Sequence, residues 1–186
     1  MDADQYQVLL DEVRQNFASV VWTHKIQEKQ ADIYAGRYTN LETANIIIAS
    51  VISCGLITIF FVDWFAVKIC SAILAFVQTS IAAYFKSFDL RGMEQRHRVA
   101  ANSFIGIRNQ LLHIISRIHM KDDLNSISKE YESTLATLEK LYMNAPSTTN
   151  QAVKEAEAAL NNRKEYTYTD EEIDQFLPPA LRGGVS

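Results

Sequence analysis

Two long uncharged runs follow each other near the middle of the chain and set its organisation. Residues 44–62 contain no Asp, Glu, Lys or Arg, and a helix of that length rises ~28 Å, close to the hydrocarbon thickness of a bilayer. The run at 65–85 has one charge, Lys68, placed near its start where a long side chain can reach the headgroups. Only Asp63 and Trp64 separate the runs. We therefore predict a transmembrane helical hairpin over residues 43–85.

A buried hairpin inside a soluble helical bundle is the alternative interpretation of these two runs. Helices of a soluble core usually keep a polar stripe, because some part of them meets solvent. Here apolar residues occupy every face of both runs. The pattern favours the membrane.

The residues before the hairpin repeat their apolar positions with a helical period. Over residues 2–36 they recur at alternating steps of four and three, a heptad seam, which indicates a helix that packs lengthwise on another. We expect Gly36 and Asn40 to interrupt this helix and form a hinge before the membrane. The seam consists of Tyr6, Leu10, Val13, Phe17, Val20, His24, Gln27, Ala31 and Tyr34.

Two further helices are predicted after the hairpin, at about 88–120 and 124–143. The first has a seam at Phe104, Ile107, Leu111, Ile114 and Ile118, and the second a face with Leu124, Ile127, Tyr131, Leu135, Leu138 and Tyr142. Because the hairpin returns the chain beside its start, we predict an all-α fold: a two-helix transmembrane hairpin extended by a cytoplasmic antiparallel helical coiled-coil bundle. Its segments are 1–42 (N-terminal helix), 43–85 (hairpin), 86–143 (helices pairing with the N-terminal helix) and 144–186 (linker, short helix and acidic tail).

The C-terminal segment combines a linker, a short helix and an acidic tail. The composition of 144–150 indicates a linker, and 151–164 a short surface or packing helix. Thr169 and Glu172 form a capping box that opens a last amphipathic helix, with Ile173, Phe176 and Leu177 on its apolar side. We expect this helix to dock on the basic helix of its own chain; binding of a partner is the alternative.

Charge gives the orientation. The chain has a net charge of −4, yet residues 86–121 hold seven Lys or Arg against two acids. By the positive-inside rule both termini lie in the cytoplasm of a multi-pass membrane protein. The basic patch next to the second span, which also suits anionic lipids or an anionic ligand such as a nucleotide, contains Lys86, Arg91, Arg96 and Arg98.

Polar residues inside the predicted spans have two interpretations. They either allow the helices to pack closely or, in an oligomer, line a water-filled path, since a single hairpin cannot enclose a channel. These membrane-polar, pore-lining candidates are Asn45, Ser50, Ser53, Thr58, Ser71 and Gln78.

His24 and Gln27 occupy seam positions where apolar residues are expected. A buried polar group in a helical seam fixes register at a cost in stability. The alternative is a switch, in which the partners of these two side chains change when the bundle rearranges.

Catalytic patterns are lacking in the sequence. Glu94 and His97 form one Glu-x-x-His pair, whereas a di-iron bundle needs a second. His97, His113 and His119 are expected to be solvated surface histidines on the basic helix. Glycine-rich phosphate loops and nucleophilic triads are missing, and the only two cysteines, Cys54 and Cys70, fall within the spans. We therefore expect no enzyme, no metal, no cofactor and no direct binding of nucleic acid.

The layout resembles the SLATT family of bacterial two-transmembrane effectors. The resemblance rests on Trp22-Thr-His24-Lys-Ile-Gln27 on a leading helix, a tight two-span hairpin, and Glu94-Gln-Arg-His97-Arg98 opening a trailing helix. Such effectors are found beside nucleotide-signalling defence genes, nucleotide-sensing domains or reverse transcriptases. The resemblance implies an inner-membrane effector of antiphage defence that oligomerises and permeabilises the membrane, causing abortive infection, when a nucleotide signal or partner protein releases it.

A constitutive membrane anchor is the alternative function. Such a scaffold would hold a soluble partner through its coiled-coil bundle or acidic tail. The partners expected for the effector are membrane lipids, further copies of the chain, and a nucleotide-signalling enzyme or reverse transcriptase encoded nearby.

Overall fold

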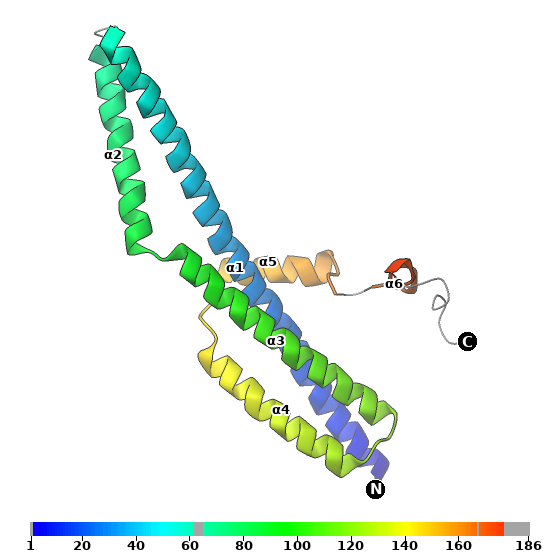
Figure 1. Ribbon diagram of the computed structural model, residues 1–186. Coiled ribbons are helices and arrows are strands. Elements are labelled where there is room, and N and C mark those ends of the chain that lie inside the picture. Colours follow the sequence, from blue (N-terminus) through cyan, green and yellow to red (C-terminus); the bar gives the residue numbers. More distant parts are fainter. Residues whose placement is uncertain (1, 62–64, 167, 177–186) are drawn as a thin grey trace.

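The computed structural model describes residues 2–61, 65–166 and 168–176, and within these ranges all regular structure is helical (Figure 1). The all-α prediction is thus confirmed. The elements are α1 (Asp2–Phe61), α2 (Phe65–Ser87), α3 (Leu90–His119), α4 (Leu124–Asn144), α5 (Asn150–Glu157), the π-helical turn η1 (Ala158–Asn162) and α6 (Asp170–Phe176).

Helix α1 runs unbroken for 60 residues. The hinge expected at Gly36 and Asn40 is wrong, because both residues lie within the continuous helix. One glycine costs an α-helix only about 1 kcal/mol relative to alanine. Gln30 and Ile33, buried before it, and the contacts of α1 with α2 after it hold the flanking turns in place. The end of the N-terminal segment at residue 42 therefore falls inside one rigid element.

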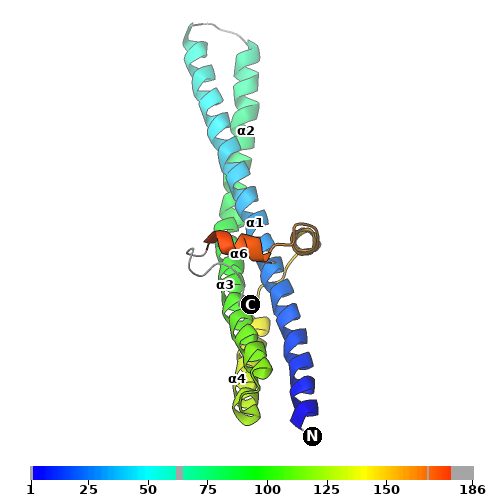
Figure 2. The ribbon, with the colours of Figure 1, turned by 90° about the vertical axis from the view of Figure 1, so that its right-hand side faces the viewer.

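Helices α1 and α3 run antiparallel and form the core of the bundle (Figures 1 and 2). Most positions of the predicted seams are buried, whereas Tyr6, Phe17 and Tyr34 are half-buried. Val13, Val20, Phe104, Leu111 and Ile114 are wholly excluded from solvent. Burial of one such side chain stabilises a fold by ~1.5–3 kcal/mol, so this row of contacts holds the two long helices together.

Helix α4 turns back along α3 and closes the bundle at the end where α1 begins (Figure 1). Asp123 caps it by accepting a hydrogen bond from the Ser126 amide at 2.8 Å, and the helix covers the range predicted from its apolar face. Of that face, Ile127, Tyr131 and Leu138 are buried.

Beyond the bundle, α2 and the second part of α1 form a long arm (Figure 1). None of the residues of α2 is buried. Among the described residues, α2 is the one helix that is long and apolar enough to cross a membrane. The two helices approach closely at Gly55, where a Cβ would lie 3.0 Å from the Ser71 hydroxyl oxygen.

The segment after α4 wraps around α1. Helix α5 packs on α1 through the buried alanines Ala152 and Ala156. The capping box of α6 is confirmed, since the Thr169 amide donates to Glu172 Oε2 at 2.8 Å and the Glu172 amide to Thr169 Oγ1 at 3.3 Å.

Docking of this last helix on the basic helix of its own chain is wrong. Helix α6 buries none of its residues, and Phe176 is 83% exposed. The short α6 lies to the side of the bundle away from α4 (Figure 1). Leu177, expected on the same apolar side, lies outside the described residues.

Candidate functional site: a buried polar cluster

A cluster of polar side chains interrupts the apolar core at the middle of the α1–α3 contact. Its members on α1 are His24, Lys25, Gln27 and Gln30, and its member on α3 is His97; each is at most 4% exposed. Buried polar groups are tolerated only when hydrogen-bonded, so the partners of this cluster decide what it can do. The two seam candidates from the sequence, His24 and Gln27, both belong to it.

His24 is held at both ring nitrogens. Its Nδ1 lies 2.9 Å from the Ala101 carbonyl oxygen of α3, and its Nε2 lies 2.7 Å from the Tyr166 hydroxyl. Burial, together with the charges of Lys25 and Arg108, lowers the pKa of His24. In the neutral ring, Nδ1–H donates to Ala101 and Nε2 is left as an acceptor.

The Tyr166 hydroxyl group has one hydrogen but two neighbouring acceptor atoms. It lies 2.7 Å from His24 Nε2 and 2.9 Å from Glu28 Oε2. A phenol has a single hydrogen, so it can donate to only one of them while His24 is neutral. A proton on Nε2 would let the Tyr166 hydroxyl donate to Glu28, but burial of the ring disfavours this charged form. The attachment of Tyr166 is therefore sensitive to the charge state around it.

Lys25 joins the C-terminal segment to α1. Its side chain is 2% exposed, and Nζ lies 2.8 Å from Glu28 and 2.6 Å from Glu165. The ammonium also lies 4.4 Å from the centre of the Tyr166 ring. We call residues 163–166, which follow η1 and end in this contact, the C-terminal strap.

The charges of this contact support one another. Burial opposes the charge on Lys25, but its hydrogen bonds to Glu165 and Glu28 outweigh burial and raise its pKa. The same hydrogen bond, with a second from Arg163, lowers the pKa of Glu165 to about 2. Burial works against the charge of Glu28 as well, yet Lys25 and Tyr166 hold its pKa below the usual value. All three groups remain ionised across the physiological range.

Gln27 and His97 form the second half of the cluster. Gln27 Nε2 donates to the Pro146 carbonyl at 2.9 Å, which leaves its Oε1 to accept from His97 Nδ1 at 2.6 Å. The His97 ring stacks on Tyr34. Burial and the Arg96 charge lower the pKa of His97. The expectation that His97 is a solvated surface histidine is wrong, because the turn of α3 that carries it faces α1.

Gln30 fastens the linker one turn further along α1. Its Oε1 accepts from both the amide and the hydroxyl of Thr149, each at 2.8 Å. Its Nε2 is buried and has no hydrogen-bond partner among the described residues. Sequence reasoning missed Lys25 and Gln30, because Glu165, which binds Lys25, and Thr149, which binds Gln30, are 119 or more residues away. The local signal was a dense row of polar residues on an otherwise apolar helix face.

The polar residues of the arm divide into two sets. Asn45, Ser71 and Gln78 are half-buried, and Asn45 Oδ1 is buried with no hydrogen-bond partner in the described part of the chain. Ser50 and Ser53 are exposed and donate to the carbonyls of Ile46 and Ala49 in their own helix. The side chain of Thr58, the sixth candidate, lies outside the described residues.

The basic residues at the end of α2 and the start of α3 have different partners. Arg91 reaches Glu42 at 3.9 Å and stacks over the Tyr38 ring, and Arg98 binds Asp32 at 3.1 Å. Arg96 points the other way, toward the α3–α4 side, and Lys86 ends α2. Two of the four predicted residues thus join α3 to α1.

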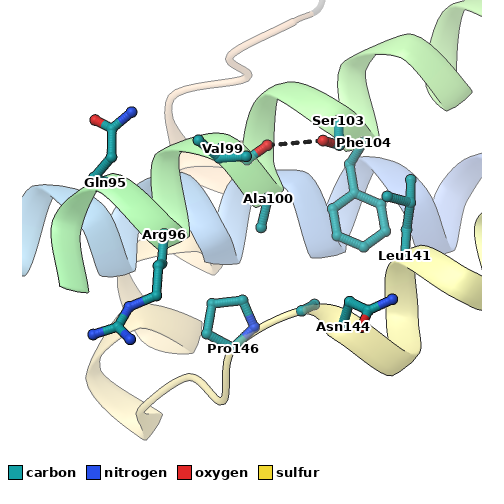
Figure 3. Close-up of a pocket in the computed structure, with 10 residues that line it drawn as sticks. Gln95, Arg96, Val99, Ala100, Ser103, Phe104, Leu141, Asn144 and Pro146 are labelled. Atoms are coloured by element: carbon teal, nitrogen blue, oxygen red, sulfur yellow. Dashed lines mark hydrogen bonds between the residues drawn. The ribbon is translucent and has the colours of Figure 1, made fainter. Parts of the chain in front are cut away.

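A groove lies between α3 and the end of α4 (Figure 3). Its volume is about 340 Å³. The Phe104 ring and Leu141 point into it, Pro146 borders it, and the guanidinium group of Arg96 lies at its edge. Most of its surface is apolar, which suits a hydrophobic side chain of a ligand or partner.

These features define a class: a helical protein with an exposed apolar arm, a bundle with a polar centre, and no metal-binding group of His, Cys, Asp or Glu within the described residues. The chain belongs to the SLATT family, since residues 9–172 match the SMODS and SLOG-associating 2TM effector domain family 4. The resemblance seen in the sequence is confirmed. Comparisons with curated proteins and with solved structures found no match. The family is one of two-transmembrane effector domains.

Proposed function

We propose that this protein is an inner-membrane effector of bacterial antiphage defence that oligomerises and permeabilises the membrane. The observation that carries the proposal is the arm, because α2 is long and apolar enough to cross a membrane and buries none of its residues. Exposing that much apolar surface to water would be strongly unfavourable, whereas lipid removes the cost. The family, one of two-transmembrane effectors, supports the same interpretation.

In this proposal both α2 and residues 44–61 of α1 cross the bilayer. The start of α1 and the later helices α3 to α6 all lie beyond the base of the arm (Figure 1). Together with the basic residues that follow α2, this arrangement supports two cytoplasmic termini. Several copies are required, because two helices cannot enclose a channel.

The polar cluster is the proposed control element. It joins α1 to α3, to the linker at Pro146 and to the C-terminal strap through hydrogen bonds and ion pairs. Since α1 continues unbroken from this cluster into the arm, a rearrangement of His24 and Gln27 would be transmitted to the membrane. The trigger is a nucleotide signal or a partner protein, such as a nucleotide-signalling enzyme or reverse transcriptase encoded nearby.

Membrane potential in expressing cells tests the proposal. Induced expression should depolarise the cells, and Asn45→Leu or Gln78→Leu should weaken the effect by removing polar groups from the arm. Ile73→Leu, an exchange at an exposed apolar position of α2, is the matched control and should depolarise like the natural chain. An unchanged potential, with the protein present in the membrane fraction, would rule out permeabilisation.

A constitutive anchor is the second candidate, and the exposed apolar face of α6 is the observation that favours it. Such a protein would hold a soluble partner through the bundle or the acidic tail. Expression would then be harmless, and a protein that co-purifies with the natural chain would be lost on deleting residues 168–186.

A further inference from the structure

We propose that the α3–α4 groove binds helix α6 of a second copy of this chain. The inference rests on the proposed function, because it supplies the contact by which the effector would oligomerise. The groove offers an apolar surface at Val99, Leu141 and Pro146, over the buried Phe104 ring, with one cation, Arg96, at its edge. Val99 is 53% exposed, so part of this surface faces solvent in a single copy.

Arg96 is available for a partner. Its neighbours Arg91 and Arg98 are committed to Glu42 and Asp32 on α1. Within the described ranges, Arg96 hydrogen bonds through Nε to the Gly92 carbonyl at 3.2 Å and forms no ion pair. Its remaining guanidinium donors can therefore bind a carboxylate that approaches the groove.

Helix α6 has the complementary chemistry. Four of its seven residues are acidic: Asp170, Glu171, Glu172 and Asp174. Ile173 is 43% exposed and Phe176 83% exposed, one helical turn apart on the same face. An aromatic and an aliphatic side chain flanked by carboxylates match an apolar groove with an arginine at its edge.

Helix α6 lies away from the groove of its own chain, and none of its residues lines that groove (Figure 1). The C-terminal strap holds Tyr166 against His24, on the side of α3 that carries Ala101 and faces α1. The groove residues Val99 and Ser103 lie on the opposite side of α3, about half a turn away around the axis. Four Cα–Cα steps join Tyr166 to Asp170, the first residue of α6, and they span ~14 Å at most. One helix with its side chains is already ~10–12 Å across.

The two surfaces suit neighbours that stand side by side in a membrane. Helix α6 and the groove lie on opposite sides of the bundle, at the level of the first half of α3 (Figure 1). Copies with parallel long axes would therefore place α6 of one beside the groove of the next. Such a head-to-tail contact uses two different surfaces on each copy and produces rings when the rotation closes.

Cross-linking between differently tagged copies tests the contact. Cys54 and Cys70 are first replaced by alanine, one copy receives Val99→Cys and the other Phe176→Cys, and both are expressed together. A short bismaleimide added to the membranes should give a dimer that carries both tags. Adding Arg96→Glu to the Val99→Cys copy should reduce that dimer severalfold. A copy with Val8→Cys, 64% exposed on α1, replaces Val99→Cys in the control and should give none.

Three results would overturn the inference: no dimer, a dimer unaffected by Arg96→Glu, or an internal cross-link in a chain that carries both cysteines. Measuring membrane potential in the same cells separates this inference from the proposed function. Depolarisation without the cross-link would leave permeabilisation standing and reject the α6 contact. The cross-link without depolarisation would support the contact and reject permeabilisation.

Discussion

At the scale of single residues, the polar cluster shows what a sequence pattern can and cannot predict. His24 and Gln27 stood out because they break an apolar heptad, and both are buried in the cluster. Lys25, Gln30 and His97 did not stand out, because charged and polar residues on a helix are usually solvated. The burial of Lys25 and Gln30 depends on the strap and the linker, which return to α1 after more than a hundred residues and carry no local signal. His97 is buried against Gln27 and Tyr34 of α1.

Replacing Lys25 by methionine should release the strap. Methionine fits the volume of the buried stem but makes neither ion pair, so Glu28 and Glu165 lose their common partner. We expect the free energy that holds the strap on α1 to fall by ~1–2 kcal/mol, a value kept small by the partial exposure of both carboxylates. Trypsin should then cut the detergent-solubilised protein faster after Arg163 and Lys164. Lys29→Met, at a more exposed pair with Asp32, is the control and should leave the cleavage rate unchanged; equal rates in all three proteins would refute the role of Lys25.

Mild acid should destabilise the bundle. Burial lowers the pKa of both His24 and His97 below the ordinary value of 6.5. The two histidines therefore contribute fully to the free energy of unfolding above pH 6.5. This contribution is lost as the pH falls through their lowered pKa values, because the unfolded state then binds protons more readily. The unfolding temperature should drop between pH 7.5 and 5.5, and less so for His97→Gln. The exposed His113→Gln should follow the natural protein. Identical pH profiles for the natural chain and His97→Gln would contradict the assignment.

At the scale of helices, the period of the apolar residues predicted α3, α4 and their buried faces correctly. The hinge predicted from two poor helix formers in α1 was wrong. Gly36 and Asn40 are poor helix formers, but α1 passes through them because packing outweighs a propensity difference of about 1 kcal/mol. The docking of α6 was inferred from opposite charge along the chain. The predicted docking fails because the strap holds Tyr166 against His24, on the side of α3 opposite to Arg96.

Gly36→Ala should stabilise the protein. A Cβ at this position meets nothing within 4 Å, and alanine is the better helix former by about 0.5–1 kcal/mol. The unfolding temperature should rise by a few degrees while depolarisation is unchanged. A stable Gly36→Ala protein that no longer depolarises cells would mean that α1 must bend there in action, which would restore the hinge.

At the scale of the whole molecule, the arm and the bundle are joined by one continuous helix. Helix α1 contributes to both, so the polar cluster and the apolar arm share a single continuous helix. The sequence predicted the all-α fold and the family because uncharged runs and heptads are local patterns. It could not predict how the linker wraps α1, since that path depends on side-chain pairs such as Gln27 with Pro146 and Gln30 with Thr149.

Protection of Cys54 and Cys70 from a hydrophilic maleimide tests most directly whether the arm lies in lipid. Both side chains are exposed in the protein alone, one on each helix of the arm. In inside-out vesicles lipid should keep the hydrophilic reagent away from both side chains, so that they react only after solubilisation in denaturant. A cysteine at position 8, at the cytoplasmic end of α1, should react at once in the same vesicles. If Cys54 and Cys70 react as fast as that cysteine in intact vesicles, the arm is not embedded in the membrane and the proposed effector mechanism fails.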